Sequence, residues 1–249
     1  MNYVYLLVPG CNEYGKNYNG LDKLKFSIDS LKKNTINYNK IYLYYGYDET
    51  SFERIEPIQN FCSDNNIIGI NIGKLKHDFG ICHARGISNP YRLNILVEKI
   101  YILINHDPSE EICFIDIDTE FHKNINNYEF DLSKPILWEN EGNLYNSRHL
   151  GNFFNSINYE LDPSTMMYNT GVIFIPLNIR NQIGQEAINL VLEMNKYDDS
   201  QRVAKDLDEQ IALSVIIHKY FKNNINFFNN VLNHYWSKVH NGEEYWITN

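Results

Sequence analysis

Hydrophobic and polar positions change their spacing repeatedly along the chain, and each change predicts a new element of secondary structure. Residues 3–9 form a short, β-rich apolar run typical of a buried strand, whereas 20–34 repeats its apolar residues at helical spacing. The two patterns continue to alternate, with strands expected at 40–47 and 67–72 and helices at 51–64 and 91–105. Strands that alternate with helices predict an α/β fold whose first half is a parallel, doubly wound sheet.

The second half of the chain has a less regular pattern. Short apolar runs predict strands at 135–139, 172–175 and 226–229. Helical spacing predicts a helix at about 179–196 and another that Asp206 and Asp208 could cap and that runs to about residue 221. A segment rich in Gly and Asn follows the first of these strands. No linker divides the 249 residues, which are enough for one α/β domain with a substantial core.

The stretch 111–121 is the part of the chain that carries the most chemical information. An apolar, β-branched run ends in two carboxylates, Asp116 and Asp118, and strand alternation would place both on one face. Two like charges this close repel each other unless a cation joins them, and oxygen ligands suit Mn²⁺ or Mg²⁺. In open α/β sheets, ligands bind beyond the carboxyl ends of the strands, where this pair lies. A turn or a helix cap is the other interpretation of the pair.

Composition narrows the choice of partners. The chain has 22 basic and 31 acidic residues, and the net charge of −9 argues against a nucleic acid or an anionic membrane as a general partner. The four cysteines form no CxxC pair, which favours reduced thiols. The first residues lack a basic leader and their apolar run is too short for a membrane span, so we expect a cytoplasmic protein.

The Asp-x-Asp after an apolar strand resembles two enzyme families. Phosphatases of the haloacid dehalogenase type have a Thr four residues after the first Asp, but residue 120 is Glu. The arrangement instead resembles glycosyltransferases of the GT-A fold, in which about a hundred nucleotide-binding residues lead to a DxD motif. This resemblance implies a Rossmann-like, mostly parallel sheet flanked by helices, with a nucleotide-binding half at 1–121 and a sugar-binding half at 122–249. Asp116 and Asp118 would then hold Mn²⁺ or Mg²⁺ on the diphosphate of a UDP- or GDP-sugar.

Two later segments resemble glycogenin-like and lipooligosaccharide galactosyltransferase-like members of that class. Asn169, Thr170 and Gly171 match the strand opening that borders the donor sugar, about fifty residues after the DxD. Asp208 and Glu209 match an acidic helix start, and the resemblance implies that one of them faces the sugar as a catalytic carboxylate. Acidic residues in a first helical turn also serve as caps, so that interpretation stands beside the catalytic one.

The C-terminal tail completes the resemblance, with departures. The glycogenin-like pattern His-x-x-Gly-x-x-Lys-Pro-Trp places its metal-binding His at His234, but Ser237 replaces the Gly and His240 replaces the Lys. His240 is therefore a second candidate metal ligand, and Lys238 is the candidate replacement for the phosphate-binding Lys.

The remaining candidate residues would bind the nucleotide. Loops after the first strands are expected to hold the base, near Val8, Pro9, Gly10 and Asp48, and Arg92 near the start of the helix before the DxD strand would bind the diphosphate. The predicted function is metal-dependent transfer of a sugar from a nucleotide sugar to a glycan, protein or small-molecule acceptor, with the resemblance favouring retention of configuration. The alternatives are a metal-dependent phosphatase or nucleotidyltransferase, and a non-catalytic sugar-nucleotide-binding descendant of the fold.

Overall fold

A computed structural model describes most of the chain. It describes residues 1–8, 20–35, 38–47, 52–75, 82–84, 87–89, 92–125, 128–146, 150–197, 207–240 and 243–248. For residue 53 and for 82–95 and 235–248 the description is limited to the backbone. None of the helices in these ranges combines the length and the apolar character that crossing a membrane requires.

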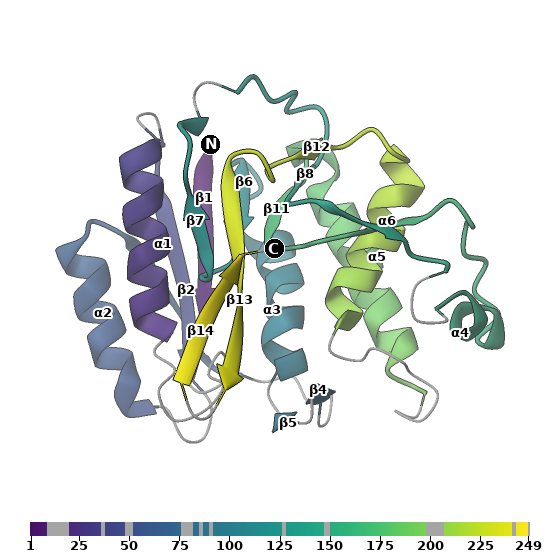
Figure 1. Cartoon of the computed structure of the whole chain (residues 1–249), viewed down its shortest axis with the longest axis horizontal. Coiled ribbons are helices and arrows are strands. Elements are labelled where there is room, and N and C mark those ends of the chain that lie inside the picture. The colour runs from purple at the N-terminus through teal and green to yellow at the C-terminus, as the bar shows by residue number, and fades with distance from the viewer. Residues whose placement is uncertain are drawn as a thin grey trace.

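A seven-stranded, mostly parallel sheet forms the centre of the molecule (Figure 1). Its strands run in the order β12-β8-β11-β6-β1-β2-β3. Their bounds are Asn226–Phe227, Ile136–Leu137, Val172–Phe174, Ile112–Ile115, Asn2–Leu7, Ile41–Tyr47 and Ile68–Lys74, in that order. β6, β1, β2 and β3 are parallel, whereas β11 is antiparallel to both of its neighbours. This architecture confirms the predicted α/β class and its parallel first half.

Helices cover both faces of the sheet because the strands are apolar on both sides. In β1, Tyr3, Tyr5 and Leu7 face the core under α1 (Gly20–Asn34) and α2 (Ile55–Asp64), which follows a short 3₁₀ turn, η1 (Phe52–Arg54). The alternate residues of β1 face the core under the helices of the opposite layer. That layer consists of α3 (Arg92–Asn105), α5 (Leu177–Met194) and α6 (Asp208–Phe221). The short helix α4 (Leu150–Ser156) packs at its outer end.

Three small sheets extend this frame. β7 (Thr119–Phe121), β13 (Leu232–His240) and β14 (Glu243–Thr248) form one of them, in the order β14-β13-β7. β9 (Asn140–Asn143) pairs with β10 (Met166–Tyr168), and β4 (Cys82–Ala84) pairs with β5 (Ile87–Asn89). The β7–β13 pairing brings the C-terminal segment to the end of β6, although the sequence pattern of this segment predicted no strand there.

The prediction that Asp116 and Asp118 lie on one face of a strand is wrong. β6 ends at Ile115, so the two aspartates do not share the face of a strand. They lie in a turn between β6 and β7, in which the Thr119 hydroxyl donates a hydrogen bond of 2.8 Å to the Asp116 carbonyl. Side chains alternate between two faces only within a strand, and both aspartates lie beyond its last residue. The turn brings the two carboxylates close together.

Candidate metal centre and active site

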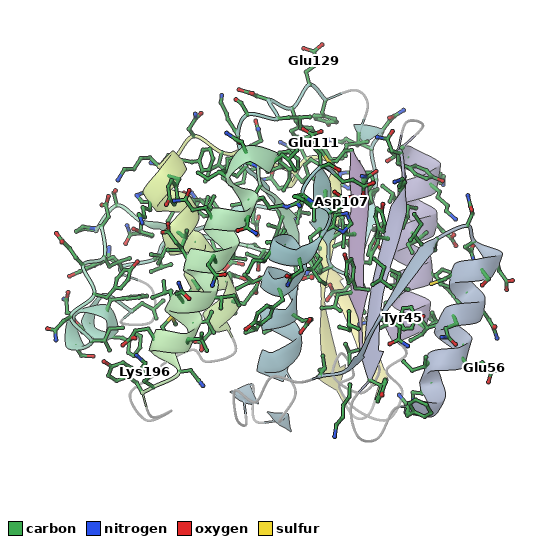
Figure 2. The ribbon with its side chains drawn as sticks, turned by 180° about the vertical axis from the view of Figure 1, so that it is seen from behind. Tyr45, Glu56, Asp107, Glu111, Glu129 and Lys196 are labelled. Carbon is green, nitrogen blue, oxygen red and sulfur yellow. The ribbon has the colours of Figure 1, made fainter. Side chains whose placement is uncertain are left out.

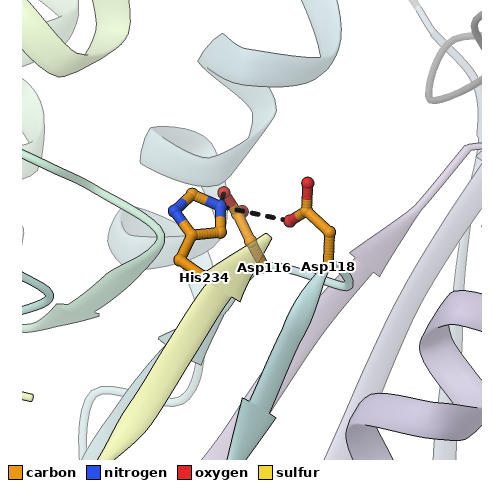
Figure 3. Close-up of side chains that lie close together, drawn as sticks. All are labelled: Asp116, Asp118 and His234. Carbon is orange, nitrogen blue, oxygen red and sulfur yellow. Dashed lines mark hydrogen bonds and ion pairs between the residues drawn. The ribbon is translucent and has the colours of Figure 1, made fainter. Parts of the chain in front are cut away.

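Asp116, Asp118 and His234 form a cluster of potential metal ligands (Figure 3). One ligand atom from each residue lies within 4.8 Å of the other two. His234 Nε2 is 3.2 Å from Asp118 Oδ1 and 3.7 Å from Asp116 Oδ2. A ring nitrogen carries at most one proton, so it cannot satisfy two carboxylates at once. Two partly exposed carboxylates that converge on one imidazole are a donor set that fits Mn²⁺ or Mg²⁺.

Strand pairing and packing place the His234 ring. His234 lies opposite Thr119 in the β13–β7 register, one residue beyond Asp118. The Trp138 ring meets the imidazole edge to face at 5.2 Å between centroids, and Trp138 Nε1 donates to the Leu232 carbonyl. Trp138 is buried, so it supports the imidazole from within the core.

The Asn169-Thr170-Gly171 segment adjoins the same cluster. The Asp116 amide donates to the Gly171 carbonyl at 2.8 Å, which ties the segment to the acidic turn. A Cβ on Gly171 would lie 2.7 Å from His234 Cε1, so a side chain at this position would displace the imidazole. The Gly171 amide donates to Asn169 Oδ1 at 2.8 Å. The structure therefore brings together the DxD, the Asn-Thr-Gly segment and His234, which are far apart in the sequence.

Lys99 is a member of the site that the sequence analysis missed. It lies on α3 in the layer under β6, and its Nζ is 2.6 Å from Asp116 Oδ1. The only signal in the sequence was a lysine amid the apolar residues of the helix. Burial favours the neutral amine, but Asp116 and Glu209 outweigh burial and raise the pKa of Lys99, so Lys99 is charged. A basic side chain from this helix had been expected from Arg92, whose side chain lies outside the described part of the structure.

The charges of the cluster stabilise one another. Burial raises the pKa of Asp118, but His234, Lys23 and Lys99 outweigh burial, and the pKa is lowered. Burial lowers the pKa of His234, but Asp118 and Asp116 outweigh it and raise the pKa. His234 therefore carries a proton more readily than an ordinary histidine. Because a metal ion binds neutral imidazole, metal and proton compete for this residue.

Glu209 is buried near the cluster at the start of α6. The Thr170 hydroxyl donates to Glu209 Oε2 at 3.2 Å. The pKa of Glu209 is raised to about 7, chiefly by burial, with the Asp116 charge acting in the same direction and Lys99 and Thr170 opposing it. A carboxyl group with this pKa exchanges its proton near neutral pH, as catalytic acids and bases do.

A surface carboxylate, Glu141, links the two segments around Glu209. Glu141 accepts a hydrogen bond from Asn169 Nδ2 at 2.7 Å and another from Gln210 Nε2 at 2.8 Å. Because Asn169 also accepts from Gly171 through Oδ1, the orientation of its amide is determined.

The other predicted site residues fall into two groups. Asp208 is buried in the first turn of α6, and Val8 is buried in the core directly after β1. Pro9, Gly10 and Asp48 lie outside the described residues, as do the side chains of Arg92, Lys238 and His240.

Comparisons with known proteins identify the fold. No family model matches the chain, and no curated protein matches it in sequence. Among solved structures, an active-site mutant of LgtC matches with a TM-score of 0.54 and 16% identity, over 91% of this chain and 72% of that one. The galactosyltransferase LgtC in complex with donor and acceptor sugar analogues matches at 0.49 and 14%, over 91% and 73%. Apo mouse xyloside xylosyltransferase 1 matches at 0.47 and 11%, over 91% and 85%.

The class of fold follows from the first of these matches together with the topology of the central sheet. The protein has the GT-A fold of glycosyltransferases, as its DxD stretch led us to expect. With sequence identity this low, the likeness identifies the fold, and the activity has to be argued from the site.

Proposed function

We propose that this chain is a metal-dependent glycosyltransferase that uses a UDP- or GDP-sugar as donor. The observation that carries the proposal is the convergence of Asp116 and Asp118 on His234, in a GT-A fold and at the carboxyl end of β6. Mn²⁺ or Mg²⁺ held by these three residues would neutralise the charge that develops on the departing diphosphate.

The side chains around the cluster suit the other parts of the reaction. In the transfer, the bond from the anomeric carbon to the diphosphate oxygen breaks and its electron pair remains on the diphosphate. The acceptor hydroxyl bonds to that carbon and loses its proton. Lys99 supplies a fixed positive charge beside Asp116, which would favour the negative charge on the departing diphosphate. We assign one of two roles to Glu209: it accepts the proton of the acceptor hydroxyl, or it stabilises positive charge on the sugar ring. Its pKa of about 7 allows it to act in either form.

Asn169, Thr170 and Gly171 would line the donor sugar, and Asp208, Lys238 and His240 remain secondary candidates for the site. The alternative ligand His240 would be tested only if His234→Ala left metal binding intact.

Retention of configuration is proposed from the resemblance of the Asn-Thr-Gly and Asp-Glu segments to those of glycogenin-like enzymes. Proton NMR of the first-formed product distinguishes the two anomers.

The test is donor hydrolysis, in which water takes the place of the unidentified acceptor. The purified chain is incubated with a panel of UDP- and GDP-sugars and Mn²⁺, and the released nucleotides are separated chromatographically. We expect nucleoside diphosphate from one donor, and release that falls by about 10²–10³-fold after chelation or in Asp118→Ala. Release of inorganic phosphate or pyrophosphate instead would identify a phosphatase or a nucleotidyltransferase. Release that persists undiminished in Asp118→Ala would refute the proposal.

A further inference from the structure

Helix α1 carries a polar stripe beside the apolar stripe that anchors it to the sheet. Ser27, Ser30 and Asn34 recur at helical spacing, and the two serines are buried. Buried hydroxyl groups cost free energy unless they find hydrogen-bond partners. A helix that only had to cover the sheet would carry apolar residues at these positions.

The partners of this stripe lie on β7. Ser27 Oγ is 2.8 Å from Thr119 Oγ1, the Phe121 amide donates to Ser30 Oγ at 2.9 Å, and Asn34 Nδ2 donates to the Phe121 carbonyl at 2.7 Å. Phe121 thus directs both of its backbone polar groups toward α1. Figure 1 shows β7 between α1 and β13.

The stripe takes the place of a neighbouring strand. In the part of the chain that the structure describes, β7 pairs with β13 on one edge and with no strand on the other. An unpaired strand edge presents free N–H and C=O groups, and here the side chains of α1 satisfy those of Phe121. The position of β7 is therefore determined from both edges.

A chain of hydroxyl groups continues from α1 to the acidic turn. Thr119, which is fully buried, donates to the Asp116 carbonyl at 2.8 Å. Ser27 Oγ lies between Thr119 Oγ1, at 2.8 Å, and the Tyr5 hydroxyl, at 3.4 Å. Asp118 directly precedes β7, and His234 lies opposite Thr119 on β13. Any shift of β7 against α1 would therefore move Asp118 and His234 together.

We propose that the polar stripe of α1, acting through Thr119, is a positioning device for the metal ligands. This inference rests on the proposed function, since it assigns the stripe to the proposed metal centre. Ser27, Ser30, Asn34 and Thr119 are not among the potential metal ligands of the cluster, which are Asp116, Asp118 and His234. By fixing β7, they hold Asp118 and His234 together at a set distance from Asp116, which follows β6 and bonds to Gly171, as outer-shell partners do in known metal sites.

The experiment compares three isosteric or near-isosteric variants of the full chain. Thr119→Val removes the hydroxyl and keeps the shape of the side chain, whereas Thr119→Ser keeps the hydroxyl. Tyr44→Phe is the control, because it removes a buried hydroxyl away from the acidic turn, where Tyr44 forms a hydrogen bond with His106. The dissociation constant for Mn²⁺ is measured by titration calorimetry, the melting temperature by calorimetry, and amide exchange over 119–121 and 232–234 by mass spectrometry.

The expected pattern separates positioning from stability. Thr119→Val should weaken Mn²⁺ binding about tenfold or more and speed amide exchange in both segments. Thr119→Ser should remain close to wild type, and Tyr44→Phe should lower the melting temperature without changing the affinity. If Thr119→Val is folded and binds Mn²⁺ as tightly as wild type, the positioning role is refuted and the proposed metal centre is not affected. If wild type binds no Mn²⁺, the proposed metal centre fails and the positioning role with it.

Discussion

Two clusters of polar side chains lie at the two ends of β6, and they differ in how their charged groups are arranged. Figure 2 shows Asp107 and Glu111 near the end where β6 begins. At this end Glu110 accepts hydrogen bonds from Lys40 at 2.5 Å and from Tyr42 at 2.6 Å, and contacts His106 at 3.1 Å. At the other end, Asp116 and Asp118 converge on the single Nε2 of His234.

The first cluster is complete without a ligand. His106 Nδ1 is 2.8 Å from the Tyr44 hydroxyl and its Nε2 faces Glu110, so a neutral imidazole uses both nitrogens. Arg180 donates to the carbonyls of residues 106, 107 and 110, which fixes the end of α3. Every charge in this cluster has a protein partner, and its effect is on stability.

The second cluster gathers more carboxylates than its imidazole can satisfy. Lys99 and His234 offset part of the charge, but the acids are held close together at the ligand-binding end of a parallel sheet. The number of charged residues therefore does not distinguish a candidate site from a structural network. The second cluster differs because two carboxylates and an imidazole present potential ligand atoms within 4.8 Å of one another at that end of the sheet.

The largest effect is expected from removing one carboxylate at each end of β6. Asp118→Ala should reduce donor hydrolysis by about 10²–10³-fold, because the metal supplies several kcal/mol of stabilisation to the departing charge. Glu110→Ala is the matched variant, and it should keep the activity while losing about 1–3 kcal/mol of unfolding free energy. Equal losses of activity in the two folded variants would remove the distinction between the clusters.

Replacing one lysine by methionine at each end of β6 should give the next largest effect. Lys99→Met should lower kcat by about tenfold or more, because it removes a buried positive charge beside Asp116 that would stabilise the departing diphosphate. The Mn²⁺ affinity should not fall, since Lys99 and the metal are both cations near Asp116. Lys40→Met, which removes an exposed partner of Glu110, should leave kcat unchanged. A fall in Mn²⁺ affinity in Lys99→Met, with kcat preserved, would contradict the role given to Lys99.

Two glycine substitutions test the packing around His234. Gly171→Ala would press a methyl group against the imidazole, and we expect Mn²⁺ binding to weaken about tenfold. Gly184→Ala is the control, because its Cβ would lie 2.6 Å from Ile104 Cγ1, between α5 and α3. The control should lower the melting temperature and leave Mn²⁺ binding as in wild type. Calorimetry measures both quantities, and unchanged binding in Gly171→Ala would show that the ring position does not matter.

The smallest effect is the acid sensitivity of the first cluster. Hydrogen bonds from Lys40 and Tyr42 lower the pKa of Glu110 from 4.5 to about 2. The folded state thus favours the ionised form, so this contribution is complete above pH 4.5 and is lost as the pH falls toward 2. Glu110→Gln should be less stable than wild type at neutral pH, and its melting temperature should depend less on pH in this interval. Parallel curves for the two proteins would contradict the assignment.

The sequence predicted the elements that carry a regular period. The helix expected at 20–34 is α1, with the same bounds, and β1, β2, β3 and β6 lie within two residues of their predicted starts. β13 and β14 were not predicted, because the polar and aromatic residues of the tail follow no clear alternation. Their strand structure comes from pairing with β7 and with each other, which no local pattern reveals.

The candidate site was predicted where a short motif marks it. Asp116 and Asp118 were found by their spacing, and His234 by resemblance to a known tail, although the strand argument for the aspartates was wrong. Lys99 was missed because a lysine on a helix is ordinarily solvated, and only the fold shows that it lies under Asp116. The α1 stripe was missed for a similar reason, since serine and asparagine in a helix usually face water.

Anomalous diffraction at the manganese edge tests the central claim most directly. Crystals of the wild-type chain grown with Mn²⁺ and a nucleoside diphosphate should show one strong peak among Asp116, Asp118 and His234, in contact with the diphosphate. Crystals of Asp118→Ala grown under the same conditions should show no anomalous peak at that position. A peak at another group of acids, or a bound nucleoside diphosphate without a metal between it and Asp116, would contradict the account.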